Sequence, residues 1–430
     1  MKVLIIGHLP VATQNNMGIT FLSLFSRFQR QELCQLYIYP AYPDVDRCAS
    51  FYRVTDKEVL SSLPKFGRPG GPVDPSLITP SQGLYEVAED ESLYRNRKNK
   101  SALRRLLRDA MWSLSRWYGP KLRQWLKEQQ PDCIFIAPGV AKFIYHMTLK
   151  IAKKQGIPII TYICDEYYFV SKPKEMADRL RLKLLQKKIK KLVTASAHLV
   201  VICDELKKHY EEGFGTPATT LMTGTATPIA KGLRSREHPT SICYFGNIRC
   251  NRYLSLAQIG RTLDEINAQR GTDYALKIYS SEKDKEILRT FDGIASIRLE
   301  GFLTGDAFRK AFDEAQLLLH TEAFDEDSID YVRHSVSTKI ADSLGSGIPL
   351  LAYGPAQVSS MKHLLRHSCA LTACDEDSLK QMLLTAFEDA EAREAVVTRA
   401  LKIADRYHSS EENGKQLRQI VEAAIENTAR

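Results

Sequence analysis

Short runs of apolar residues alternate along most of this chain with stretches in which apolar residues recur every three or four positions. The runs are typical of strands buried on both faces of a parallel sheet, and the stretches are typical of helices that cover such a sheet. The alternation begins with a run at 2–7, becomes regular from 133 and starts afresh at 242. It predicts an α/β fold with two doubly wound, Rossmann-like domains.

The chain is 430 residues long, which exceeds what one hydrophobic core supports and favours two domains of about 200 residues each. A segment rich in threonine and proline, 216–238, is the clearest linker between them. We therefore expect an N-terminal domain over 1–215 and a second domain over 239–407. Residues 40–100 are rich in proline, glycine and charge, and we expect loops there.

The composition is that of an ordinary folded chain, with 44% apolar and 26% charged residues. No apolar run approaches the roughly 18 residues of a membrane-spanning helix, and the run at 2–7 is too short for a signal peptide. The nine cysteines form no Cys-Xaa-Xaa-Cys pair, so the pattern supports neither a disulfide framework nor a zinc site. These features predict a protein of the reducing cytoplasm that is not integral to a membrane.

The formal net charge of +9 is concentrated in two segments of the N-terminal half. Residues 95–127 contain eleven lysines and arginines against one acidic residue, and residues 172–191 contain nine against two. Leucines of the first segment recur at helical spacing, and all three tryptophans lie there, Trp112, Trp117 and Trp125. A basic amphipathic helix with aromatic residues is typical of an element that lies on an anionic membrane surface.

The same pattern also fits a helix that packs on its own domain with a solvated charged face, and the residues leave both interpretations open. The charge of the second segment favours the membrane. Nucleic acid is disfavoured as a partner, because the aromatic residues accompany leucines on a helix instead of lining a sheet on which bases stack. We therefore expect 95–127 and 172–191 to contact an anionic membrane surface and no nucleic acid.

A different chemistry is indicated at Ser337, Thr338 and Lys339, which stand at the start of an amphipathic helix that Gly345 and Gly347 end. The free N–H groups and the positive dipole end of a first helical turn attract an anion, and the two hydroxyls can cap the helix or donate to that anion. Lys339 adds a mobile positive charge. This arrangement predicts a phosphate-binding site.

The run Ser-Thr-Lys-Ile at 337–340, followed by Gly-Ser-Gly and Ile-Pro-Leu-Leu, resembles the donor-site helix of GT-B glycosyltransferases, a group that includes many bacterial surface-polysaccharide enzymes. The resemblance implies two Rossmann-like domains facing a central cleft, with a C-terminal helix, about 408–430, packed back on the first domain. In family 4 of these enzymes a glutamate of this helix binds the nucleotide ribose, and Asp342 stands at its position. His334 stands where family 4 has its other glutamate, so it is a catalytic candidate and the stereochemistry of transfer stays open.

The first βα turn of the second domain holds Gly246, Arg249 and Arg252. In family 4 the glycine is followed by an arginine and a lysine near the donor diphosphate. Asn247 replaces the first here, and Arg252 occupies the second position. The resemblance thus implies that Arg252 and Lys339 clamp the diphosphate, with Arg249 as a third candidate. The alternative for each arginine is that it lies on the surface, is solvated and has no role in binding.

Three further candidates lie close to predicted strands. Asp165 follows the strand 157–164, where a carboxylate can act as a base on an acceptor hydroxyl, bind the sugar, or only cap the next turn. Glu322 follows the strand 317–320 and either contacts hydroxyls of the donor sugar or belongs to an acidic loop. For Gly18, after the first strand, the resemblance to GT-B enzymes implies a loop that a donor or acceptor approaches closely, and the alternative is a glycine at the entry of a helix.

Together these features predict an enzyme that moves a sugar from a nucleotide diphosphate donor, UDP- or GDP-linked, to a growing, lipid-linked cell-surface glycan. We expect it to be cytoplasmic and peripheral to the inner face of the cytoplasmic membrane. No metal or other cofactor is expected, because GT-B enzymes usually stabilise the diphosphate with basic groups and no Asp-Xaa-Asp motif ends a strand. A sugar-nucleotide epimerase of the same architecture, or an inactive scaffold, is the alternative.

Overall fold

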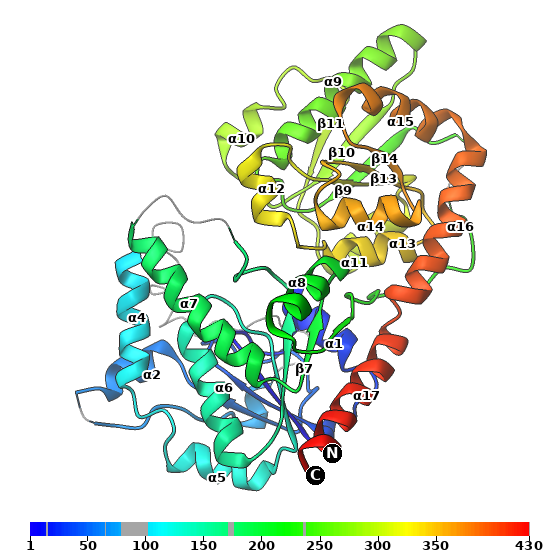
Figure 1. Cartoon of the computed structure of the whole chain (residues 1–430). Helices are drawn as coiled ribbons and strands as arrows, with labels where there is room; N and C mark the ends of the chain where they lie inside the picture. The colour runs from blue at the N-terminus through cyan, green and yellow to red at the C-terminus, as the bar shows by residue number, and fades with distance from the viewer. Residues whose placement is uncertain (14–15, 65, 79–101, 171–175, 235–237, 430) are drawn as a thin grey trace. The chain divides into compact units, whose positions relative to one another are not determined.

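The computed structural model describes residues 1–13, 16–64, 66–78, 102–170, 176–234 and 238–429. The chain divides into two compact units. Unit 1 comprises Met1–Thr223 and Ser410–Arg430, and unit 2 comprises Gly224–Ser409. Each unit is a largely parallel sheet covered by helices (Figure 1). This is the α/β architecture that the alternating pattern predicts.

Unit 1 is built on an eight-stranded sheet with the strand order β4-β3-β2-β1-β5-β6-β7-β8. All neighbouring pairs are parallel except β3 and β4. The order reverses between β1 and β5, as it does in doubly wound sheets. The strands are β1 (Val3–Gly7), β2 (Leu33–Tyr37), β3 (Ser50–Arg53), β4 (Gly71–Pro72), β5 (Cys133–Ile136), β6 (Ile159–Ile163), β7 (His198–Val201) and β8 (Ala218–Thr220).

The last helix of the chain belongs to unit 1. It packs against the first helix, and its Leu417, Val421 and Ala424 are buried in the same core as Phe21 and Phe25. The described helices of unit 1 are α1 (Asn16–Leu24), α2 (Asp56–Ser62), α4 (Ala102–Leu114), α5 (Pro120–Gln129), α6 (Lys142–Gln155), α7 (Met176–Ala195), α8 (Asp204–Phe214) and α17 (Ser410–Ala429). Within the described part of the chain, no helix combines the length and the apolar character needed to cross a membrane.

Unit 2 contains a six-stranded, fully parallel sheet with the order β11-β10-β9-β12-β13-β14, which reverses between β9 and β12. Its strands are β9 (Ser241–Phe245), β10 (Ala275–Tyr279), β11 (Ile297–Gly301), β12 (Leu317–Thr321), β13 (Leu350–Tyr353) and β14 (Leu371–Ala373). Its helices are α9 (Arg252–Arg270), α10 (Lys285–Arg289), α11 (Gly305–Asp313), α12 (Glu326–Val332), α13 (Thr338–Gly345), α14 (Ser359–His367), α15 (Glu376–Glu388) and α16 (Ala390–Tyr407).

Glycines end several of these helices where the sequence predicts a stop. Gly156 after α6, Gly215 after α8 and Gly271 after α9 adopt the left-handed conformation, with φ of 70°, 69° and 66°. A residue without a Cβ reaches this conformation at little cost, and its N–H then satisfies a carbonyl of the last turn. The chain can therefore turn back at once into the next strand.

Two segments contain more structure than the pattern indicates. Within 40–100, residues 50–53 form β3 and residues 56–62 form α2. Helix α2 begins with a capping box, in which the Thr55 hydroxyl accepts from the N–H of Glu58 and the Glu58 carboxylate accepts from the N–H of Thr55. Within 216–238, β8 joins the sheet of unit 1, and the chain from Gly224 onward belongs to unit 2.

All three tryptophans are buried inside unit 1. The Trp112 ring stacks on Phe143 with 4.1 Å between centroids, and its Nε1–H donates to Asp56 at 2.7 Å. The tryptophans of the first basic segment therefore contribute to the core of unit 1 and not to its surface. Residues 95–101 and 172–175 of the basic segments lie outside the described residues.

The two ends of unit 2 meet through a backbone hydrogen bond, in which the N–H of Thr225 donates to the carbonyl of His408 at 2.8 Å. The imidazole of His408 is buried beside that of His363, with 3.2 Å between their Nε2 atoms. Such a contact is a hydrogen bond only when one of the two nitrogens carries a proton. Burial, followed by the neighbouring His408 and His367, lowers the pKa of His363 to about 2.

Candidate functional site

The candidate site of unit 2 lies where the strand order reverses, between β9 and β12. The carboxyl ends of these neighbouring parallel strands form the crevice in which open α/β sheets bind ligands. Gly246 directly follows β9, and Glu322 directly follows β12. Lys339, at the start of α13, belongs to the connection from β12 to β13. The topology therefore brings together three residues that lie far apart in the sequence.

The turn after β9 determines where Arg252 lies. The Asn247 side-chain oxygen accepts from the N–H of Arg249 at 2.7 Å. Cys250 and Asn251 then both adopt the left-handed conformation, with φ of 55° and 56°. This tight turn ends where α9 begins, so Arg252 occupies the first helical position, beside the end of β12.

Arg252 forms an ion pair with Glu322. Its Nε and Nη2 both lie 2.8 Å from Oε2 of Glu322. The Glu322 side chain is 4% exposed and that of Arg252 is 20% exposed. Burial opposes the charge of Arg252, but the attraction of Glu322 outweighs it, so the pKa of Arg252 is raised. The pair leaves part of the guanidinium accessible to an incoming anion.

His320, in β12, is buried next to this ion pair, with Nε2 3.6 Å from Oε1 of Glu322. Burial lowers the pKa of His320, and the charges of Arg252 and Lys339 lower it further against the opposite effect of Glu322. The imidazole is thereby held in its neutral form. Its Nε2 is buried and makes no hydrogen bond with the residues that the structure describes.

Lys339 stands beside Gly246. A Cβ added at Gly246 would lie 3.2 Å from Nζ of Lys339 and 3.1 Å from the hydroxyl of Tyr244, so a side chain there would intrude on the space next to the ammonium group. The Lys339 side chain reaches the surface, yet surrounding protein displaces water from its ammonium group and, with the charge of Arg252, lowers its pKa. The glycine thus keeps the ammonium group accessible to a ligand.

Helix α13 begins at Thr338, directly after Ser337. Ser337 is the residue before the helix, in an extended conformation, and its side chain makes no capping hydrogen bond. Its N–H donates to the hydroxyl of Ser360 at 3.3 Å. Thr338 is the first helical residue, followed by Lys339. The Ser337 hydroxyl is not used by its own helix, although it stands at the positive end of the helix dipole.

Two of the predicted ligand-binding residues are engaged within unit 2. Asp342 accepts from the N–H of Ala226 at 2.7 Å, and burial raises its pKa. Arg249 forms a two-pronged pair with Glu282, at 2.5 and 3.1 Å, and this hydrogen bonding lowers the pKa of Glu282 to about 2. A ligand would have to compete with these contacts.

His334 lies in the turn between α12 and α13 and is half-buried. Part of the acidic run after Glu322 has a structural role, because Asp325 caps α12 by accepting from the N–H of Ser328 at 3.0 Å and also accepts from the side-chain amide of Asn251 at 3.0 Å. In the described ranges, no group of three or more His, Cys, Asp or Glu side chains is arranged to hold a metal ion.

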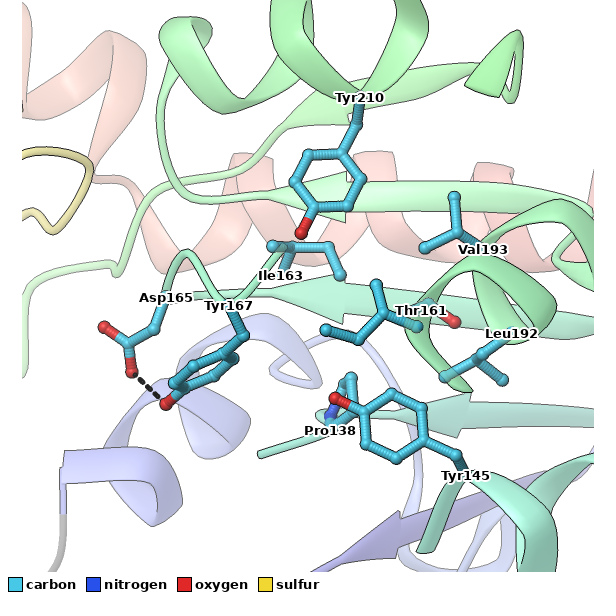
Figure 2. Close-up of a pocket in the computed structure, with 10 residues that line it drawn as sticks. Pro138, Tyr145, Thr161, Ile163, Asp165, Tyr167, Leu192, Val193 and Tyr210 are labelled. Carbon is cyan, nitrogen blue, oxygen red and sulfur yellow. Dashed lines mark hydrogen bonds between the residues drawn. The ribbon is translucent and has the colours of Figure 1, made fainter. Parts of the chain in front are cut away.

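Gly18 and Asp165 belong to unit 1. Gly18 lies in α1, where a Cβ would overlap the carbonyl oxygen of Ala12, so the glycine permits a close approach of the chain to itself. Asp165 follows β6 and accepts from the hydroxyl of Tyr167 at 3.1 Å (Figure 2). The surrounding cavity, also lined by Tyr145, has room for about one water molecule. Asp165 is therefore engaged by the hydroxyl of Tyr167, while that of Tyr145 donates to the carbonyl of Gly139.

Glu166 is a polar group that the sequence reasoning did not select. Its Oε1 accepts from the N–H groups of Tyr168 and Phe169, at 2.6 and 3.0 Å, and from the hydroxyl of Tyr210 at 3.2 Å. Burial raises the pKa of Glu166 against these hydrogen bonds. The available signal was its place beside Asp165 after a buried strand.

No protein-family model matches the sequence, and no curated protein matches it. Solved structures resemble it over nearly its whole length. HepE of Anabaena, crystallised with UDP, aligns with a TM-score of 0.63 and 10% identity over 98% of this chain and 100% of that chain. Sucrose-phosphate synthase of Thermosynechococcus elongatus aligns with a TM-score of 0.62 and 9% identity over 99% of this chain and 100% of that chain. A third structure is a UDP-forming α,α-trehalose-phosphate synthase of Burkholderia xenovorans, crystallised with glucose-6-phosphate. It aligns with a TM-score of 0.60 and 10% identity over 97% of this chain and 100% of that chain.

At this low identity the likeness concerns the fold. It shows that the chain has the architecture of GT-B glycosyltransferases, which confirms the predicted fold class. The likeness does not single out family 4.

Proposed function

We propose that this chain is a glycosyltransferase that takes a sugar from a nucleotide diphosphate donor. One observation carries the proposal: Arg252 and Lys339 converge at the point where the strand order of unit 2 reverses, and Gly246 leaves room beside the lysine. Two cations, each in the first turn of a helix, suit a diphosphate. The UDP complex of HepE and the UDP-forming trehalose-phosphate synthase, which share the fold, support this choice of donor.

In this proposal the cations act on the leaving group. Cleavage of the bond between the anomeric carbon and the phosphate oxygen leaves positive charge on the sugar ring and negative charge on the nucleoside diphosphate. Arg252 and Lys339 stabilise that negative charge, and the hydroxyls of Ser337 and Thr338 donate to it. Because these groups supply the stabilisation, the transfer needs no metal ion or other cofactor.

The transferred sugar is proposed to lie near Glu322 and His320. Arg252 holds Oε2 of Glu322, so Oε1 remains to accept from sugar hydroxyls, and the neutral His320 lies beside it. Asp342 would contact the ribose by exchanging the N–H of Ala226 for a ribose hydroxyl, with Arg249 close to the donor. His334 is proposed to approach the same sugar from the turn before α13.

The acceptor is proposed to be a growing, lipid-linked cell-surface glycan, reached at the inner face of the cytoplasmic membrane. Asp165 would remove the proton of the acceptor hydroxyl if the transfer inverts the anomeric carbon, or bind the acceptor if it retains the configuration. The basic surface of unit 1 supports the membrane location. An epimerase of the same architecture is the second candidate, and it has no use for such a surface.

Calorimetric titration with UDP, GDP and their sugar conjugates tests the donor site. Lys339→Ala should weaken binding about 10- to 100-fold, because a hydrogen bond to a charged group contributes about 1.5–3 kcal/mol. Lys339→Arg should retain part of the affinity. Lys402→Ala, at an exposed position of α16, is the matched control and should bind like the wild type.

If no nucleoside diphosphate binds, the proposed function is wrong. If Lys339→Ala binds a nucleoside diphosphate as tightly as the wild type, the diphosphate does not lie at the start of α13. Chromatography of a nucleotide sugar incubated without acceptor separates the two candidate functions, because an epimerase converts the sugar and a transferase leaves its configuration unchanged.

A further inference from the structure

Helix α7 of unit 1 carries an apolar stripe on its outer side. Met176, Leu180 and Leu184 lie four residues apart and are 84%, 54% and 39% exposed. Residues with this spacing share one face of a helix. Leu185 and Ile189 bury the opposite face in unit 1. The exposed leucines are therefore additional to the contacts that hold α7 on its own unit.

The neighbouring helix α4 has the same arrangement. Leu107 and Leu114 are 60% and 74% exposed, and Ala110 on the same face is exposed too. Trp112 lies on the opposite, buried face. Helix α4 packs against α7, and the two helices lie side by side in Figure 1. The two stripes thus belong to adjacent elements of one unit.

Exposed basic residues surround the apolar stripe of α7. They are Arg179, Lys183, Lys187, Lys190 and Lys191. Acidic side chains on the two helices are paired with cations: Asp109 lies 3.0 Å from Lys142, and Asp178 lies 3.5 Å from Arg181. The outer side of these helices therefore presents leucine, methionine and positive charge.

This combination of charges and apolar side chains selects among partners. A second copy of the chain would place like charges against each other in a two-fold interface. A nucleic acid would satisfy the charges, but the tryptophans on which bases could stack are buried. An anionic bilayer offers phosphate groups to the lysines and hydrocarbon to the leucines at the same boundary.

We propose that the outer sides of α4 and α7 form a docking face that holds unit 1 on an anionic lipid bilayer. The exposed leucines and Met176 enter the boundary between headgroups and acyl chains, and the lysines of α7 contact lipid phosphates. This inference rests on the proposed function, because a lipid-linked acceptor is what brings the enzyme to a membrane. The contact is made by leucines, not by the tryptophans that the sequence pattern suggests.

Sedimentation with vesicles tests the docking face. The wild-type chain should sediment with vesicles of equal parts phosphatidylglycerol and phosphatidylcholine in low salt, and much less with phosphatidylcholine alone or in high salt. Leu180→Gln/Leu184→Gln should bind at least about tenfold more weakly, since it removes apolar area that the bilayer buries. Its matched control is Leu299→Gln/Leu365→Gln, which changes two exposed leucines of unit 2.

Lys183→Gln/Lys187→Gln tests the charge. Each lysine near an anionic surface contributes about 1 kcal/mol, so the pair should account for about 30-fold in binding. Lys285→Gln/Lys402→Gln removes two exposed lysines of unit 2 and should have little effect. Far-UV circular dichroism of each variant checks that α7 is still folded.

The docking face is refuted if the wild type does not bind the anionic vesicles or if both α7 variants bind like the wild type. A wild type that dimerises, with dimerisation lost in Leu180→Gln/Leu184→Gln, would show that a second copy covers the face instead. UDP binding measured on the same samples separates this inference from the proposed function: vesicle binding can fail while nucleotide binding persists, and nucleotide binding can fail while vesicle binding persists.

Discussion

The two units share a sheet topology, but their strand ends hold different kinds of buried titratable group. In unit 1, Glu166 takes hydrogen bonds from two N–H groups and the hydroxyl of Tyr210, and burial raises its pKa. In unit 2, Glu322 is paired with Arg252, and burial lowers the pKa of the adjacent His320. Unit 1 thus holds a carboxyl group that only hydrogen-bond donors contact, and unit 2 holds an ion pair beside a buried imidazole.

This difference shows how one sheet topology can carry different side chains at its strand ends. The sheets determine where strand ends lie, and the residues placed there determine what charge they present. Unit 2 places the cations Arg252 and Lys339 there, which the proposed function assigns to a diphosphate. Unit 1 places tyrosine hydroxyls and carboxyl groups there, which hydrogen-bond with one another. The same contrast predicts different responses to mutation and to pH.

The largest effect is expected when the ion pair is broken. Arg252→Met leaves the buried carboxylate of Glu322 without its cation and should lower the free energy of unfolding of unit 2 by about 3 kcal/mol. Adding Glu322→Gln removes the uncompensated charge, so the double variant should recover much of the loss. Urea unfolding followed by far-UV circular dichroism measures these values.

Tyr210→Phe is the corresponding change in unit 1 and should cost about 1–2 kcal/mol, because it removes one hydrogen bond to Glu166 and leaves the two N–H donors in place. Tryptophan fluorescence follows unit 1 selectively, because all three tryptophans lie there. A loss from Tyr210→Phe as large as that from Arg252→Met would contradict the contrast between the units.

A change of pH should have an intermediate effect on the free energy of unfolding of unit 2. His363 titrates near 6.5 in an unfolded chain but at about 2 in unit 2, so below pH 6.5 the unfolded chain binds a proton that the folded chain does not. Unit 2 should therefore lose about 2 kcal/mol from this group between pH 7.5 and pH 5. Unfolding of His363→Gln over the same range should show a correspondingly smaller pH dependence.

Glu166 should give the stability of unit 1 a pH dependence opposite to the one that His363 gives unit 2. Its raised pKa means that the folded unit 1 holds a proton more tightly than the unfolded chain, so this contribution to stability is present at low pH and is lost as pH rises through the folded pKa. Glu166→Gln should remove that dependence, as followed by tryptophan fluorescence. An unchanged pH profile in this variant would show that Glu166 does not distinguish unit 1.

The smallest effect concerns hydroxyl groups of unit 2. Ser337 makes no capping hydrogen bond, so Ser337→Ala should cost less than about 0.5 kcal/mol of stability while weakening UDP binding about two- to tenfold. Asp375 caps α15 by accepting from the N–H of Ser378 at 2.8 Å, and Asp375→Ala should cost about 1 kcal/mol without affecting UDP binding. If Ser337→Ala lowered stability by about 1 kcal/mol and left UDP binding unchanged, Ser337 would stabilise its helix and not contact a ligand.

Much of the fold could be predicted because strands buried on both faces leave a strong pattern. The runs at 2–7, 133–137 and 242–245 coincide closely with β1, β5 and β9. Short strands such as β3, next to the edge of the sheet, and β8, at the other edge, bury fewer residues and leave little pattern. Helix α2 was missed because the surrounding proline and glycine content outweighed its Thr55-Xaa-Xaa-Glu58 capping signal.

The positions of the candidate site residues could be predicted better than their partners. Arg252 and Lys339 follow from local signals, a βα turn and a helix start. That Arg252 would pair with Glu322 depends on β9 and β12 being neighbours in the sheet, which no local spacing reveals. The tryptophans show a related difficulty, since an amphipathic pattern identifies two faces of a helix without telling which of them is buried.

The return of α17 to unit 1 has a consequence for synthesis on the ribosome. Unit 2 is an insertion into unit 1, and its own residues are contiguous from Gly224 to Ser409. Domains fold as their residues emerge, at about 5–20 residues per second. Unit 2 is therefore complete before unit 1, whose core lacks Leu417 and Val421 until the final helix leaves the ribosome. During that interval the face of α1 that α17 covers is exposed, so it is protected from aggregation or chaperone binding only after unit 2 has been synthesised.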